Sequence, residues 1–113
     1  MGLGSDVAGG ASLSIFRAMA EAIQVSKLRW RLTDAAWPPL SVPEAFYLGT
    51  LGGGAFFGRV GGFEPGYEVD ALVLEDRSLN PPQLSIPERL ERIVYLSDER
   101  QLRHKYVAGC LLW

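Results

Sequence analysis

The first long hydrophobic segment, residues 12–28, has almost no polar face. Arg17, Glu21 and Gln24 form one narrow polar stripe, and apolar side chains occupy nearly every other side. This pattern predicts a helix, with Ser12 or Ser14 as its N-cap. A helix that is apolar almost all round requires burial by more protein than one small sheet supplies.

Two further helices are predicted by a shared start signal, Ser-x-Pro-Glu, at residues 41–44 and 85–88. In each segment, the serine oxygen can accept a hydrogen bond from the glutamate amide, and the glutamate carboxylate can accept one from the serine amide. This reciprocal arrangement is a capping box. The first helix is expected to run to about Leu51 and to end at the glycines 52–54. The second has one amphipathic face, formed by Ile86, Leu90, Ile93 and Val94. The repeat reflects cap chemistry only, and there is no internal duplication.

Shorter apolar runs predict strands. Residues 1–6 resemble the last residues of a buried strand, and residues 69–74, apolar except for Asp70, predict another buried strand. Residues 63–67 predict a turn with Pro-Gly at its centre. The tail, 103–113, alternates loosely around Gly109 and predicts a hairpin. The expected fold class is therefore mixed α and β.

Composition narrows the class of protein. The 113 residues are 48% hydrophobic and 21% charged, with a net charge of −2, which is typical of one globular domain. No basic run forms a nucleic-acid footprint, and no apolar run reaches the ~20 residues that span a bilayer. We therefore expect neither nucleic acid nor membrane as a partner. The single cysteine and the absence of a secretory signal favour a reducing, cytoplasmic setting.

Few residues are candidates for chemistry. Asp6, before Gly-Gly, is by itself a turn or cap residue. His104, between Arg103 and Lys105, is predicted to lie on an exposed strand. Cys110 lies in an apolar tail without a neighbouring base, which predicts a buried, inert thiol.

Two further features receive structural interpretations. Residues 52–54 lack the Lys-Ser/Thr that a phosphate-binding loop requires, so a helix stop is favoured. The three tryptophans are assigned to core or interface packing, namely Trp30, Trp37 and Trp113.

Taken together, several segments resemble one family. They are residues 2–6 (GLGSD), 12–16 (SLSIF), 44–53 (EAFYLGTLGG), 60–74 (VGGFEPGYEVDALVL) and 89–100 (RLERIVYLSDER). The chain resembles the C-terminal quarter of guanine deaminases, in the zinc-dependent amidohydrolase superfamily. Residues 63–74 alone indicate only the superfamily, and residues 89–100 indicate guanine deaminases more narrowly.

The resemblance implies an architecture. Residues 1–40 would be the last strand-helix unit of an amidohydrolase TIM barrel, and residues 41–60 the post-barrel helix and connector. Residues 61–113 would belong to the adjoining small β-sandwich domain, with its terminal helix and strands.

The resemblance also implies an activity, the conversion of guanine and water to xanthine and ammonia by a zinc hydroxide. Asp6 corresponds to the aspartate that ends strand eight, where it binds the metal and shuttles a proton. A metal keeps such a carboxylate ionised, and active sites of this barrel lie at the strand C-termini. The family's metal-binding histidines have no counterpart here, whereas zinc needs three or four protein ligands. The isolated chain is therefore expected to be inactive and to bind no zinc alone.

Its expected partners are the missing N-terminal barrel portion or a second copy of itself, with guanine as the substrate of the parent family. Two alternatives stay open. The chain could be an oligomeric protein-interaction module without catalysis, or part of an amidohydrolase that acts on another aminated heterocycle.

Overall fold

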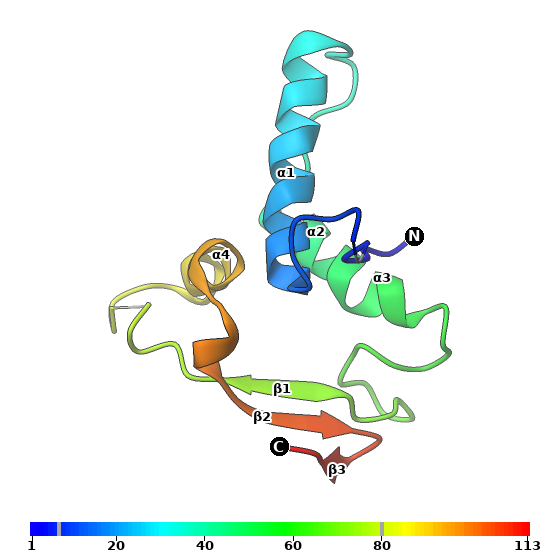
Figure 1. Cartoon of the computed structure of the whole chain (residues 1–113), viewed down its shortest axis with the longest axis vertical. Coiled ribbons are helices and arrows are strands. Elements are labelled where there is room, and N and C mark those ends of the chain that lie inside the picture. The colour runs from blue at the N-terminus through cyan, green and yellow to red at the C-terminus, as the bar shows by residue number, and fades with distance from the viewer. Residues whose placement is uncertain (7, 80) are drawn as a thin grey trace.

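The structure, a computed structural model, describes residues 1–6, 8–79 and 81–113. In these described ranges, four α-helices lie on one side of a small sheet (Figure 1). The elements in chain order are α1 (Ile15–Leu32), α2 (Val42–Gly49), α3 (Leu51–Gly54), β1 (Ala71–Leu74), α4 (Ile86–Leu96), the 3-10 helix η1 (Glu99–Gln101), β2 (Leu102–Val107) and β3 (Cys110–Leu111). The predicted mixed α and β class is confirmed. None of the described helices is both long enough and apolar enough to cross a membrane.

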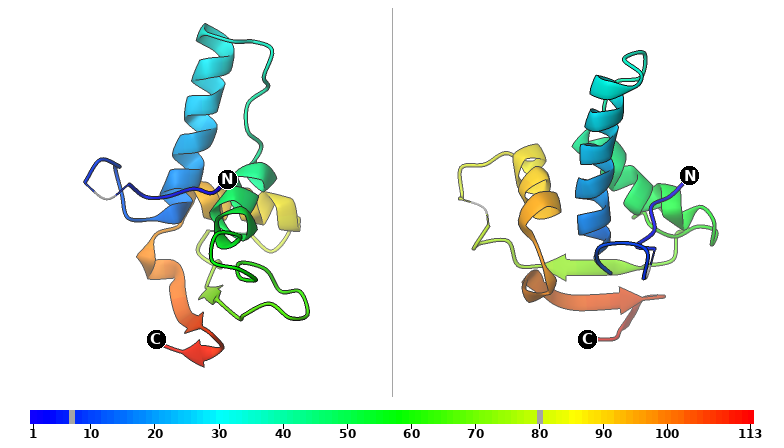
Figure 2. Two further views of the ribbon diagram at one scale, coloured as in Figure 1. Left: turned by 90° about the vertical axis from the view of Figure 1, so that its right-hand side faces the viewer. Right: turned by 45° about the horizontal axis from the view of Figure 1, so that its top comes forward.

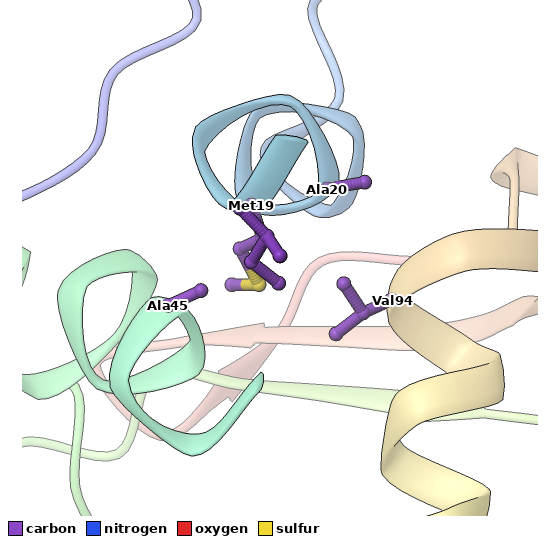
Figure 3. Close-up of a cluster of buried hydrophobic side chains, with 5 residues drawn as sticks. Met19, Ala20, Ala45 and Val94 are labelled. Carbon is purple, nitrogen blue, oxygen red and sulfur yellow. The ribbon is translucent and has the colours of Figure 1, made fainter. Parts of the chain in front are cut away.

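The buried core lies where α1, α2 and α4 meet. Met19 and Ile23 of α1 are 1% and 2% exposed, and Val94 of α4 is 2% exposed. Figure 3 shows the Met19 side chain between Ala45 of α2 and Val94 of α4. Since these side chains come from three helices, the core depends on the packing of distant parts of the sequence.

The predicted first helix is confirmed, but its burial is one-sided. Ser14 is the N-cap, and its hydroxyl accepts a hydrogen bond from the Arg17 amide at 3.4 Å. The helix continues four residues past the predicted end, to Leu32. Val25 is 62% exposed and Leu32 is 77% exposed. Because α2 and α4 cover one side of α1, its remaining apolar surface is open in this chain.

The capping box at Ser41 is present, but the predicted glycine stop is wrong. The Ser41 amide donates to Glu44 at 2.8 Å, and α2 ends at Gly49 rather than at about Leu51. The glycines 52–54 form the helical turn α3 instead of ending a helix. Two of these glycines are buried, which indicates that close backbone packing rather than chain termination requires them.

The sheet is antiparallel, in the order β1-β2-β3. The hairpin predicted around Gly109 is confirmed, with Tyr106 opposite Leu111 and Val107 opposite Cys110. Ala108 and Gly109 both have positive φ, 49° and 76°, as a type I′ turn requires. The turn predicted at residues 63–67 is also present, and Gly66 has a φ of +87°.

The predicted buried strand at 69–74 is shorter, and its burial is wrong. The strand spans Ala71–Leu74, and Leu72 and Val73 are 50% and 43% exposed. The helices pack mainly on one another, as the two views in Figure 2 show, and leave the sheet below them. Without a second layer on the sheet, apolar strand residues stay open to solvent.

The described residues 1–6 form no strand, contrary to the prediction. Their backbone instead makes one hydrogen bond to α2, from the Leu3 amide to the Leu48 carbonyl at 2.9 Å. A strand needs a neighbouring strand to accept its backbone bonds. No closed barrel exists in the described residues to supply one.

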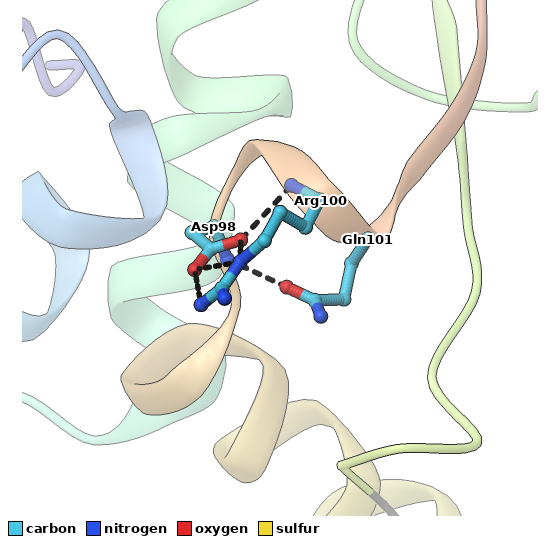
Figure 4. Close-up of polar contacts among 3 residues, drawn as sticks. All are labelled: Asp98, Arg100 and Gln101. Atoms are coloured by element: carbon cyan, nitrogen blue, oxygen red, sulfur yellow. Dashed lines mark hydrogen bonds and ion pairs between the residues drawn. The ribbon is translucent and has the colours of Figure 1, made fainter.

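Carboxylates at helix starts are held ionised by local hydrogen bonds. The Ser41 hydroxyl and amide donate to Glu44, and Ser85 donates likewise to Glu88, at 2.6 and 2.8 Å in both cases. These bonds lower the pKa of both glutamates from the usual value for glutamate. In Figure 4, the carboxylate of Asp98 accepts from the Arg100 side chain and amide. Those hydrogen bonds lower the pKa of Asp98 to about 2.

These lowered pKa values predict an acid-sensitive fold. A carboxylate whose pKa is depressed by folding stabilises the native state above its unfolded pKa, and the contribution is lost as pH falls through the folded pKa. The melting temperature is therefore expected to decrease as the pH falls from about 5 to about 2. Thermal unfolding followed by circular dichroism measures it. Removing both caps in Ser41→Ala/Ser85→Ala should flatten this dependence, whereas Glu91→Gln on the open side of α4 should leave it unchanged. An equal pH dependence in the double variant would contradict the role of the caps.

Candidate functional site

Asp6 lies in a tight turn that precedes α1. Its φ is 48°, in the left-handed region that aspartate tolerates better than most residues. Its carbonyl accepts hydrogen bonds from the amides of Gly9, at 2.8 Å, and Gly10. The turn therefore fixes the backbone at Asp6 and leaves the residue exposed.

The two glycines of this turn leave room for Asp6 and its neighbour. A Cβ on Gly9 would lie 2.5 Å from Oδ2 of Asp6, so the carboxylate lies directly over the loop backbone. A Cβ on Gly10 would overlap the Ser5 carbonyl. The spacing Asp-x-x-Gly-Gly is itself a turn signal, in agreement with the turn or cap role that the sequence predicts for Asp6.

The other candidate residues lie in the sheet. His104, on β2 opposite Val73, is exposed, as predicted. Cys110, on β3 opposite Val107, is also exposed, so the prediction of a buried thiol is wrong. The reason is that β3 is the outer strand of the sheet, and none of the described helices covers it.

The tryptophans do not lie in the core. The side chains are 43%, 65% and 63% exposed in Trp30, Trp37 and Trp113. This exposure excludes core packing in the described structure, so interface packing is the interpretation that remains. The three tryptophans come from α1, from the connector after it and from the C-terminal residue.

The described residues do not fit a zinc ion by themselves. Structural and catalytic zinc sites use three or four protein ligands at once. Within the described ranges, no three His, Cys, Asp or Glu side chains gather where they could hold a metal. Among the described residues, one surface hollow lies beside the start of α1 and another beside Asp76 and Arg89, and Asp6 lines neither. The arrangement around Asp6 can therefore supply one carboxylate ligand or proton acceptor, but not a complete site.

Comparison with known proteins identifies what the chain resembles. No protein-family model matches it. The mouse (Mus musculus) guanine deaminase is 35% identical over 96% of the chain, and the Escherichia coli enzyme is 32% identical over all of it. The chain spans about a quarter of the length of each relative, 26% in both cases.

Solved structures agree with these relatives. A guanine deaminase from C. acetobutylicum, with guanine bound in its active site, superposes with a TM-score of 0.94 at 46% identity. It covers 99% of this chain, which corresponds to 27% of that protein. The E. coli guanine deaminase superposes with a TM-score of 0.80 at 31% identity.

The sequence and the fold are thus similar to one segment of a class of longer hydrolases, the deaminases. Within this class the chain is homologous to guanine deaminases over about a quarter of their length. The resemblance predicted from the sequence is confirmed.

Proposed function

We propose that this chain is the C-terminal segment of a guanine deaminase-type hydrolase, which converts guanine and water to xanthine and ammonia. The observation that supports this most is the 0.94 TM-score, at 46% identity, to a guanine deaminase with guanine in its active site. The agreement extends over nearly the whole chain, so it includes the turn that carries Asp6. A cytoplasmic location fits this assignment and remains part of the proposal.

In this proposal Asp6 would be one ligand of a zinc ion and would serve as a proton acceptor for water. The remaining metal ligands and the residues that recognise guanine come from the other three quarters of the enzyme. Residues 1–40 would complete its barrel, residues 41–60 would connect the two parts, and residues 61–113 would join a second, small β-domain. The open face of α1 and the half-exposed strand β1 are the surfaces that such a neighbour would cover.

The test is complementation. The purified chain is mixed with a fragment of the C. acetobutylicum guanine deaminase that lacks the matching segment, and xanthine and bound zinc are measured. The chain alone is expected to form no xanthine and to retain no stoichiometric zinc, whereas the mixture should do both. Activity in the chain alone would overturn the dependence on a second part. A mixture that folds together but stays inactive would overturn the deaminase role.

An association role is favoured by a separate observation, the number of exposed apolar side chains on α1. Val25, Leu28 and Leu32 are 62%, 59% and 77% exposed on one helix. Because so much apolar surface is unfavourable in water, we expect the isolated chain to self-associate. Size-exclusion chromatography with light scattering should give a mass above 12.4 kDa. The variant Val25→Lys/Leu28→Lys should shift that mass toward the monomer, and Leu13→Lys, an exposed residue before the helix, should not. A stable monomer of the unmodified chain would contradict self-association.

A further inference from the structure

The first residues of the chain lie directly against α2 and α3. The amide of Leu3 donates to the carbonyl of Leu48 at 2.9 Å, which joins the segment to α2. In Figure 1 and in the two views of Figure 2, the chain near the N-terminus runs beside α3. The turn at Asp6 thus begins three residues after an anchored position, Leu3.

The contact is between two backbones, without side chains in between. A Cβ on Gly2 would lie 2.6 Å from the Cα of Gly53 and 3.1 Å from its nitrogen. A Cβ on Gly52 would lie 2.8 Å from the Met1 carbonyl oxygen. Real Cβ atoms do not approach other atoms so closely, so glycine is required on both sides of this contact.

This contact accounts for one glycine of α3, Gly52, in a place where glycine weakens a helix. Glycine in a helix interior is less favourable than alanine by about 1 kcal/mol. The α3 turn nevertheless consists of Leu51 followed by three glycines. The close approach of residues 1–3 requires the small residue at Gly52, and the cost to the helix is offset by the contact it permits.

We infer that the glycine turn of α3 is a seat for residues 1–3 and thereby positions Asp6. Two restraints then act on Asp6, one from the residues before it in the sequence and one from the residues after it. The seat and the Leu3–Leu48 hydrogen bond hold the residues before it, and the hydrogen bonds from Gly9 and Gly10 hold its own carbonyl. The glycines act through the backbone and touch no substrate, so they are positioning residues. The functional meaning of this arrangement rests on the proposed role of Asp6, but the seat itself does not.

Hydrogen exchange of the Leu3 amide, measured by NMR, tests the seat in the chain as it stands. Gly2→Ala is expected to speed this exchange by about 10-fold, because the added methyl group separates the segment from α3 and breaks its hydrogen bond. Gly4→Ala is the matched control, since a Cβ at Gly4 meets nothing within 4 Å and should leave the exchange unchanged. The methyl resonances of the buried Val94 report whether the helical core stays folded in each variant.

The reverse variant tests the same contact from the other side. Gly52→Ala is also expected to speed Leu3 exchange, with the Val94 signals retained. Unchanged Leu3 exchange in Gly2→Ala would overturn the inference.

Failure of the inference and failure of the proposed function give different results. In the complemented mixture, a seat that positions Asp6 predicts that Gly2→Ala lowers kcat while KM for guanine stays the same, and that Gly4→Ala changes neither. Faster Leu3 exchange together with an inactive unmodified mixture would overturn the proposed function and support the seat. Faster exchange with an unchanged kcat would overturn the positioning of Asp6.

Discussion

Replacing Asp6 with asparagine is expected to lower the kcat for guanine deamination by about 10²–10⁴-fold in the complemented mixture. Asparagine keeps the shape of the side chain but cannot accept a proton as a carboxylate does, and it is a weaker ligand for zinc. The expected loss is in turnover and in zinc content, with little effect on folding, because Asp6 is exposed and lies outside the core.

Steady-state kinetics and metal analysis of the mixture measure this effect. Glu64→Gln provides a matched control, since it removes an exposed carboxylate from a turn far along the chain from Asp6. The control should retain activity. If Asp6→Asn kept the full kcat and zinc content, Asp6 would be a turn residue only.

The largest effect on stability is expected for Met19→Ala. Met19 is 1% exposed and packs between α2 and α4, so truncation leaves a cavity at the meeting point of three helices. Such truncations typically lower the free energy of unfolding by about 2–5 kcal/mol. Urea denaturation followed by circular dichroism measures the change.

Val25→Ala on the same helix is the matched control. Val25 is 62% exposed, so its truncation should change the free energy of unfolding by less than about 0.5 kcal/mol. Equal losses in the two variants would mean that the core does not lie where the structure places it.

Local sequence signals predicted the elements whose hydrogen bonds are made within a few residues. Ser41 and Glu44 close their own cap, as do Ser85 and Glu88, and both helices begin where the sequence predicts. The Ala108-Gly109 turn between β2 and β3 was also predicted from its local pattern, although its two amides donate to the Asp70 carboxylate at 2.8 Å and to the Val69 carbonyl at 2.9 Å. The homology to guanine deaminases was also recognisable from residues in sequence order, because it depends on residue identity rather than on packing.

Burial was predicted less well, because it depends on which surfaces meet. The apolar pattern of α1 does not say that α2 and α4 cover only one side of it, and the apolar run at 69–74 does not reveal that Leu72 and Val73 stay half-exposed. Cys110 was assigned to the interior for the same reason, although β3 is an outer strand.

The candidate site likewise has one part that the sequence predicts and one part that depends on tertiary packing. The sequence by itself determined that Asp6 is the candidate ligand and that the metal-binding histidines of the family are missing, since both follow from residue identity. Only the tertiary structure decided that residues 1–6 rest on α2 and α3 instead of forming a strand. That outcome depends on a backbone contact between Gly2 and Gly53, which lie 51 positions apart, and no local pattern encodes so distant a fit.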